Sequence, residues 1–324
     1  MSKYRAELPQ LRGGTWIADG GMETTLIFHE GMALPQFASF VLLEYPEGRQ
    51  RLRNYHRRYL EIARRHGTGF ILDTATWRAN PDWGAKLGYD AAGLDRISRL
   101  AVAEMEGLRQ EFETPATPHV ISGAIGPRGD AYQAGRIAVA EAQAYHAPQI
   151  ESFAATAADM VTAFTLNSIA EATGIARAAQ AAAMPCAISF TLETDGCLLS
   201  GQTLREAIEE VDAATGSSVA YFMVNCAHPL HLAGSFEGEG GWRERILGLR
   251  ANASVKSHAE LDESETLDEG DPADLGRRYV EIRRHLPSLR IMGGCCGTDH
   301  RHVAAICEAC LPMPDAATER AASA

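Results

Sequence analysis

Residues 290–297 read Arg-Ile-Met-Gly-Gly-Cys-Cys-Gly, a short apolar run that passes directly into glycines and two adjacent cysteines. Runs of this length, rich in apolar and β-branched residues, recur along the whole chain, and segments with helical periodicity separate them. The pattern predicts eight strands, at residues 16–19, 70–74, 119–123, 160–165, 187–192, 220–225, 246–251 and 290–294.

The segments between these runs carry helix signals. Helices are expected over residues 46–67, 141–158, 170–184, 203–216, 271–287 and 302–311. Gly67 closes the first of them, Pro148 interrupts the second, and Asp271 caps the helix that ends at residue 287. Eight strands that alternate with helices favour an α/β fold, a single-domain (β/α)8 TIM barrel. A doubly wound sheet is less favoured because no Gly-x-Gly-x-x-Gly follows the first strand.

The length of 324 residues fits one large barrel or two medium domains. No Pro/Gly/Ser-rich linker divides the chain, and no internal repeat is present. We therefore expect an N-terminal extension over residues 1–12, the barrel over residues 13–313 and a frayed, Ala-rich tail over residues 314–324.

The composition excludes several partners. Thirty basic against forty-two acidic side chains give a formal charge of −12, which disfavours nucleic acids and anionic membrane surfaces. The chain has no apolar stretch long enough to span a bilayer and no signal-peptide pattern at its N-terminus. We expect a cytoplasmic protein without nucleic-acid or membrane partners, and the sequence leaves a homo-oligomer open.

Seven cysteines, without a signal peptide, disfavour a disulfide framework and favour metal or thiol chemistry. Four of them are expected in ordinary core packing: Cys186, Cys197, Cys307 and Cys310. Cys295 and Cys296 are neighbours flanked by three glycines, and a disulfide between them would strain the intervening peptide. In a barrel all strands end at one face, which brings Cys226, at the end of the 220–225 run, to the same mouth.

Three thiolates with an open fourth position are how proteins hold a catalytic zinc ion. Two other interpretations remain open from spacing alone: buried thiols in a tight turn, and a vicinal redox dithiol.

Four segments together resemble the homocysteine S-methyltransferase family, which includes betaine-homocysteine methyltransferase and the homocysteine domain of methionine synthase. They are Asp-Gly-Gly at 19–21, Ser-Gly-Ala-Ile-Gly-Pro at 122–127, Val-Asn-Cys at 224–226 and Gly-Gly-Cys-Cys-Gly at 293–297. The resemblance covers about residues 13–310. It implies a Zn²⁺-dependent enzyme of methionine synthesis that moves a methyl group from a cationic donor to the thiol of homocysteine. Such donors include S-methylmethionine, S-adenosylmethionine and betaine.

The resemblance also implies roles for particular residues. Cys226, Cys295 and Cys296 correspond to the zinc ligands and form the catalytic centre. Asp19, at the end of the first strand, corresponds to a residue that holds the ammonium group of the amino-acid substrate; from the residues alone, a capping aspartate in a tight turn is the alternative. The backbone of Gly20, Gly21 and Met22 is expected to receive the substrate carboxylate.

The chain departs from the family pattern at the end of the fourth strand. Relatives carry a substrate-binding glutamate there, whereas this chain has Phe164, followed by Thr165, which we expect to contact the substrate. Another acid would have to supply the charge: Glu193 is the nearest candidate, ahead of Glu23 and Asp195. The alternative is that the same zinc barrel acts on a different thiol or methylated compound. A third alternative is a non-catalytic zinc or thiol redox protein.

Other polar and aromatic groups follow predicted strands. Asn225 is expected to orient the cysteine loop or to contact metal or substrate. The loop after residue 251, with His258, is long enough to cover the mouth as a lid. Trp77 and Trp83 either face a methylated cation or pack the loop after the second strand.

Overall fold

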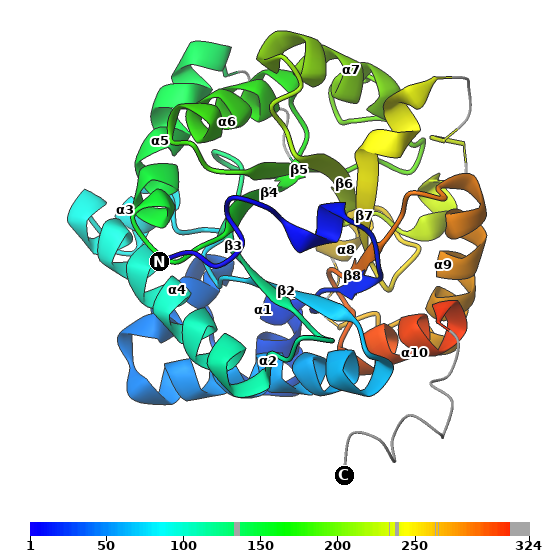
Figure 1. Ribbon diagram of the computed structural model, residues 1–324, viewed down its shortest axis with the longest axis horizontal. Coiled ribbons are helices and arrows are strands. Elements are labelled where there is room, and N and C mark those ends of the chain that lie inside the picture. Colours follow the sequence, from blue (N-terminus) through cyan, green and yellow to red (C-terminus); the bar gives the residue numbers. More distant parts are fainter. Residues whose placement is uncertain (133–136, 233, 237–239, 263, 265, 312–324) are drawn as a thin grey trace.

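The computed structural model describes residues 1–132, 137–232, 234–236, 240–262, 264 and 266–311. It is a closed barrel of parallel strands in sequence order, in which β8 pairs back with β1 (Figure 1). The strands are β1 (Trp16–Ile17), β2 (Gly69–Asp73), β3 (His119–Ile125), β4 (Met160–Leu166), β5 (Cys186–Phe190), β6 (Tyr221–Asn225), β7 (Ile246–Ala251) and β8 (Ile291–Gly294). The predicted (β/α)8 barrel is therefore confirmed.

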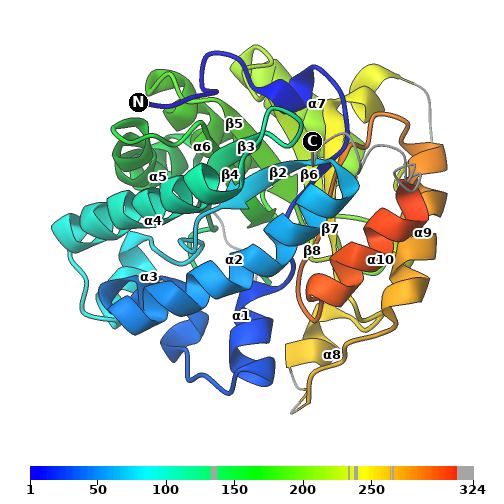
Figure 2. The same cartoon turned by 60° about the horizontal axis from the view of Figure 1, so that its bottom comes forward.

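Helices surround the barrel (Figures 1 and 2). They are α1 (Met22–Thr24), α2 (Pro46–His66), α3 (Pro81–Lys86), α4 (Ala91–Phe112), α5 (Val139–Ala154), α6 (Ile169–Ala181), α7 (Leu204–Thr215), α8 (His258–Asp262), α9 (Pro272–His285) and α10 (His300–Cys310). A π turn (Thr25–His29) and short 3₁₀ turns (Pro9–Leu11, Pro35–Phe37, Ser39–Glu44, Pro229–Leu232, Gly241–Arg245) complete the regular structure of the described residues. None of the helices described combines the length and apolar character needed to cross a bilayer.

The predicted helix ends agree with the local chemistry. Gly67 ends α2 in the left-handed conformation, with φ of 63°. The side chain of Asp271 accepts a hydrogen bond from Ala273 N at the start of α9. One helix prediction is wrong: α5 continues through Pro148 instead of being interrupted.

The residues that follow Pro148 account for this difference. Ile150 and Phe153 are fully buried in the core, and the Phe153 ring packs on Gly123 of β3, where a Cβ atom would lie 2.6 Å from the ring. Burial of two large side chains contributes roughly 3–6 kcal/mol, which offsets the cost of about 3 kcal/mol for an internal proline.

The N-terminal segment lies across the amino ends of the strands, over the centre of the barrel in Figure 1. Leu8 packs there, together with Trp16, in a second hydrophobic cluster that includes Met160 and Tyr221. The Arg5 guanidinium donates hydrogen bonds to the carbonyls of Ala154, Thr156 and Ala158. The boundary at residue 13 stays a prediction, and the tail over residues 314–324 lies outside the described residues.

The structure also places the four cysteines that were expected in the core. Cys186 and Cys307 are buried. Cys197 and Cys310 are half-buried. Cys310, the last residue of α10, packs against the core, so the prediction is wrong only for Cys197, which belongs to the loop after β5.

The packing of α5 on α6 depends on Gly174. A Cβ atom there would lie 2.7 Å from Gln143 N and 2.8 Å from Val139 O, so Gly174→Ala forces the helices apart. We expect a loss of about 1–3 kcal/mol in the free energy of unfolding, measured by denaturant titration. Gly107→Ala, at an exposed position of α4, is the matched control, because no atom outside the helix backbone lies within 4 Å of the added Cβ; it is expected to stabilise by up to about 1 kcal/mol. Equal effects of the two substitutions would contradict this account.

Candidate functional site

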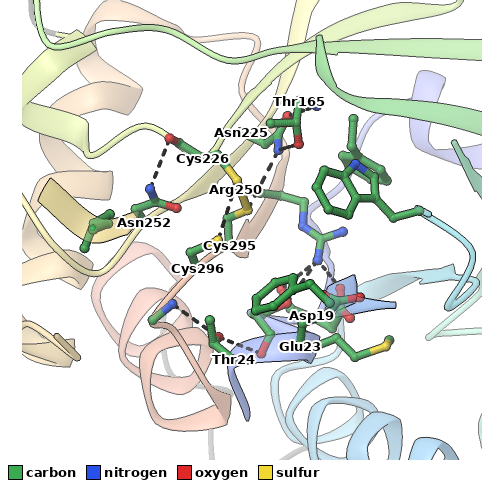
Figure 3. A pocket seen from close by; sticks show the side chains of 18 of the residues that line it. Asp19, Glu23, Thr24, Thr165, Asn225, Cys226, Arg250, Asn252, Cys295 and Cys296 are labelled. Carbon is green, nitrogen blue, oxygen red and sulfur yellow. Dashed lines mark hydrogen bonds and ion pairs between the residues drawn. A yellow bond between two sulfur atoms is a disulfide. The ribbon is translucent and has the colours of Figure 1, made fainter. Parts of the chain in front are cut away.

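Three sulfur atoms meet at the carboxyl ends of β6 and β8 (Figure 3). The Sγ atoms of Cys226, Cys295 and Cys296 all lie within 4.8 Å of one another. Cys226 and Cys295 form a disulfide, and Cys296 is free, with its Sγ 4.0 Å from that of Cys226. The barrel therefore gathers the predicted cysteines. Their role as a set of three thiolates stays a prediction, and in this structure two of the three are joined by the disulfide.

Backbone contacts hold the cysteine loops in place. Cys226 has a φ of 55°, a left-handed conformation that non-glycine residues rarely adopt. Its amide donates to Arg250 O at 3.1 Å, and the amide of Cys295 donates to Ala251 O at 2.8 Å. A Cβ atom on Gly21 would lie 2.6 Å from Cys295 O, so only glycine lets the loop after β1 approach the cysteine loop this closely.

Asn225 links the ends of three strands beside the sulfurs. Its Oδ1 accepts hydrogen bonds from Thr165 N at 2.8 Å and from Ser189 Oγ at 2.7 Å. Its Nδ2 donates to Thr165 Oγ1 at 2.9 Å and lies 3.8 Å from the Sγ of Cys295. These contacts match the orienting role that was considered for Asn225, with Thr165 as its main partner.

A buried ion-pair network lies beneath the cysteines. Arg250 of β7 forms an ion pair with Asp19, after β1, and its Nη1 lies 2.7 Å from Oδ2 of Asp73 in β2. Its Nε donates to Gly294 O at 3.1 Å. The ring of Phe164 faces the guanidinium at 5.1 Å. All of these side chains are buried.

The network changes the ionisation of its members. Burial raises the pKa of Asp73 to about 7, although the charge of Arg250 lowers it. Burial opposes the charge of Arg250, but the two carboxylates raise its pKa above the ordinary value. Arg250 therefore remains a cation inside the barrel. Sequence reasoning missed this network, and the available signal was a charged residue within the otherwise apolar 246–251 strand.

The loop after β1 packs tightly against the loop after β8. Gly21 N donates to Thr298 O at 3.0 Å, and Tyr55 Oη donates to Gly20 O at 2.9 Å. Met22 begins α1 and is buried. Asp19, Gly20, Gly21 and Met22 all line the same cavity as the cysteines.

That cavity has a volume of about 450 Å³ and opens at the carboxyl ends of the strands, a size typical of small-molecule sites. It brings the predicted residues Asn225 and Thr165 together with the cysteines, and Phe164 lines it as well. Residues of the loop after β7 also line it: Leu261, Ser264, Thr266, Leu267 and Asp268. Whether this loop acts as a lid stays a prediction. The side chain of His258 lies outside what the structure describes.

Several predicted residues lie elsewhere. Glu193 is not among the described residues that line the large cavity. It lines a separate small depression, which Cys226, His228 and His231 also line. Trp77 does line the cavity. Trp83 is covered by the chain's own cations, since Arg78 lies 3.9 Å and Lys86 3.8 Å from its ring centroid. This supports packing as the role of Trp83.

Cys296 has a hydrogen-bond partner, Tyr132, that the sequence did not reveal. Burial raises the pKa of its thiol to about 11, the charge of Glu23 adds to the rise, and a hydrogen bond with Tyr132 lowers it. A free Cys296 is therefore protonated at neutral pH, and a bound cation would favour the thiolate. The chemistry of the three sulfurs thus fits a metal ligand set.

Fold and site together define a barrel enzyme with a cysteine-rich centre at its mouth. The sequence profile of the homocysteine S-methyltransferase family matches residues 16–310, so the chain belongs to this family and is a methyltransferase, which confirms the resemblance inferred from its motifs. Among curated proteins, none matches the sequence significantly.

Solved structures of the homocysteine methyltransferase MmuM from Escherichia coli share the fold. The oxidized form superposes with a TM-score of 0.73 at 22% identity, covering 92% of this chain and 97% of that one. The metallated form gives a TM-score of 0.69 at 21% identity, covering 94% and 99%. At this level of identity the likeness shows the common barrel.

The buried network predicts a large effect of removing its cation. Arg250→Met leaves Asp19 and Asp73 buried without their partner, so we expect a loss of about 3 kcal/mol or more in the free energy of unfolding. Arg205→Met is the matched control, because its ion pair with Glu209 on α7 is exposed, and we expect less than about 0.5 kcal/mol. Denaturant titration of both variants checks this. A loss for Arg250→Met as small as that of the control would contradict the network's role.

Proposed function

We propose that the protein is a zinc-dependent S-methyltransferase that transfers a methyl group from a cationic donor to the thiol of homocysteine, giving methionine. The observation that carries this proposal is the meeting of Cys226, Cys295 and Cys296 on the wall of one cavity. Membership of the homocysteine S-methyltransferase family supports the acceptor. The donors considered are S-methylmethionine, S-adenosylmethionine and betaine.

The three cysteines fit a zinc ion by number, by ligand type and by the closeness of their sulfurs. Since Cys226 and Cys295 form a disulfide, the site must first be reduced by an external thiol. When bound, zinc would keep the acceptor thiol in its anionic, nucleophilic form. A metallated form of a protein with the same fold supports a metal in this family.

The chain's own residues prepare the site for transfer. Asn225 holds the strand ends next to Cys295, and Tyr132 forms a hydrogen bond with Cys296. Described residues of the loop after β7, such as Leu261 and Leu267, form part of the cavity wall. In the transfer, the acceptor sulfur attacks the methyl carbon in line while the bond to the donor's sulfur or nitrogen breaks. The donor leaves without its positive charge, and alignment of the two partners is the main requirement.

One observation favours a second candidate, in which the same barrel methylates a different thiol. Phe164 stands where relatives carry a substrate-binding glutamate, and its ring lies against Arg250. A cytoplasmic location and a homo-oligomeric state stay predictions from the sequence, as do the domain boundaries.

Reduced protein is expected to bind one zinc ion per chain, because the ligand set is complete only when the disulfide is open. The Cys226→Ser, Cys295→Ser double variant should lose the zinc, measured by elemental analysis. Cys310→Ser, at the end of α10, is the control that should retain it. Stoichiometric zinc in the double variant would contradict the ligand assignment.

Methyl transfer is tested with the reduced, zinc-loaded protein. Homocysteine is offered with S-methylmethionine, S-adenosylmethionine and betaine in turn, and methionine is quantified by mass spectrometry. We expect methionine with at least one of these cationic donors. No methionine with any of the three would contradict the proposed function.

A further inference from the structure

The acidic side chains that line the cavity differ in the ion pairs and hydrogen bonds that they form with the rest of the protein. Asp19 and Asp73 share the Arg250 guanidinium. Asp268 accepts hydrogen bonds from Ser254 Oγ and Gly270 N and lies 3.8 Å from the ammonium of Lys256. Asp130, another acid of the lining, accepts a hydrogen bond from Tyr132 N at 3.0 Å. These carboxylates are already engaged by groups of the protein. A substrate ammonium that met Asp19 would have to compete with a buried arginine.

Glu23 is in a different position. It lies on α1, four residues after Asp19, and its half-buried side chain lines the cavity. Ser39 Oγ donates to its Oε1 at 2.6 Å. The charge of Arg78 acts on Glu23, but within the described part of the chain no basic side chain forms an ion pair with it. Figure 3 shows Asp19 and Glu23 on the same side of the cavity, opposite Asn225 and Thr165.

The electrostatics of Glu23 favour a cation from outside the protein. Burial raises the pKa of Glu23 above its ordinary value, and the hydrogen bond from Ser39 only partly offsets this. A carboxylate that has lost much of its hydration gains more than an exposed one when an ammonium group donates to it.

A positively charged side chain, held by contacts with the protein, lines the same cavity. Arg78 lines it, and the guanidinium lies 3.9 Å from the ring centroid of Trp83 and 5.1 Å from that of Trp77. Its Nη1 donates to Gln36 O at 2.8 Å. The charge of Arg78 acts on Glu23, where it opposes the rise in pKa that burial causes. A guanidinium held in this way presents a planar fork suited to a carboxylate.

We infer that Glu23 and Arg78 form the amino-acid recognition pair of this site, with Glu23 receiving the ammonium of the acceptor and Arg78 its carboxylate. The inference rests on the proposed function and specifies its acceptor as a zwitterionic amino-acid thiol. Glu23 thereby replaces the glutamate that is absent at Phe164, and Asp19 serves to hold Arg250.

The experiment compares three acceptors that differ by one charge: homocysteine, 4-mercaptobutanoate without the ammonium, and 3-aminopropane-1-thiol without the carboxylate. Affinity is measured by calorimetry on the reduced, zinc-loaded protein, and kcat/KM is measured at saturating donor. Wild-type protein is expected to prefer homocysteine to each analogue by roughly ten- to hundredfold, the range of one charge-assisted hydrogen bond.

Glu23→Gln keeps the size of the side chain and removes its charge. It should reduce the preference for homocysteine over 4-mercaptobutanoate to within about threefold while leaving the preference over 3-aminopropane-1-thiol intact. Arg78→Gln should show the reverse pattern. Glu209→Gln, on the exposed face of α7, is the control and should change neither. Zinc content and the thermal midpoint of each variant show whether the site and fold are preserved.

Three results would overturn the inference. The first is an unchanged preference in Glu23→Gln, which would place the ammonium at another acid. The second is a rise in the KM of the donor alone, which would make Glu23 a donor-binding residue. The third is equal affinity of wild-type protein for homocysteine and 4-mercaptobutanoate. If the protein methylates none of the thiols, the proposed function fails, and the calorimetric comparison still decides the role of Glu23.

Discussion

The buried guanidinium of Arg250 is the interaction on which the arrangement of the site depends. Arg250 belongs to β7, between the two strands that carry the cysteines, and it reaches Asp19 after β1 and Asp73 in β2. Its Nε also holds the carbonyl of Gly294, immediately before Cys295. A single cation thus ties the loop of the first strand to the cysteine loop of the last, where the barrel closes.

The sequence revealed the features that are encoded by short, local patterns of residues, namely the strands and the residues at their ends. Apolar runs marked all eight strands, and their ends located Cys226, Cys295 and Cys296 at one face because parallel strands in a barrel end together. The ion-pair network escaped prediction because Arg250 and Asp19 are 231 residues apart and no local pattern encodes their contact. The pairing of Cys226 with Cys295, and the partner of Cys296 in Tyr132, depend in the same way on the closed barrel.

The charges of the cavity give the departure at Phe164 a physical meaning. An aromatic ring at this position packs against the guanidinium of Arg250, where a glutamate would add a third acid to Asp19 and Asp73. We infer that Glu23 on α1, which lines the same cavity, supplies the charge that β4 does not.

The central claim is that the three cysteines form a metal centre with one position for the acceptor thiol. Zinc-edge X-ray absorption of the reduced, zinc-loaded protein, before and after homocysteine is added, tests it most directly. The account predicts three sulfur ligands in the free protein and four with homocysteine, since the acceptor sulfur takes the open position. A coordination shell that homocysteine leaves unchanged, or one that already has four sulfur ligands without it, would contradict the account.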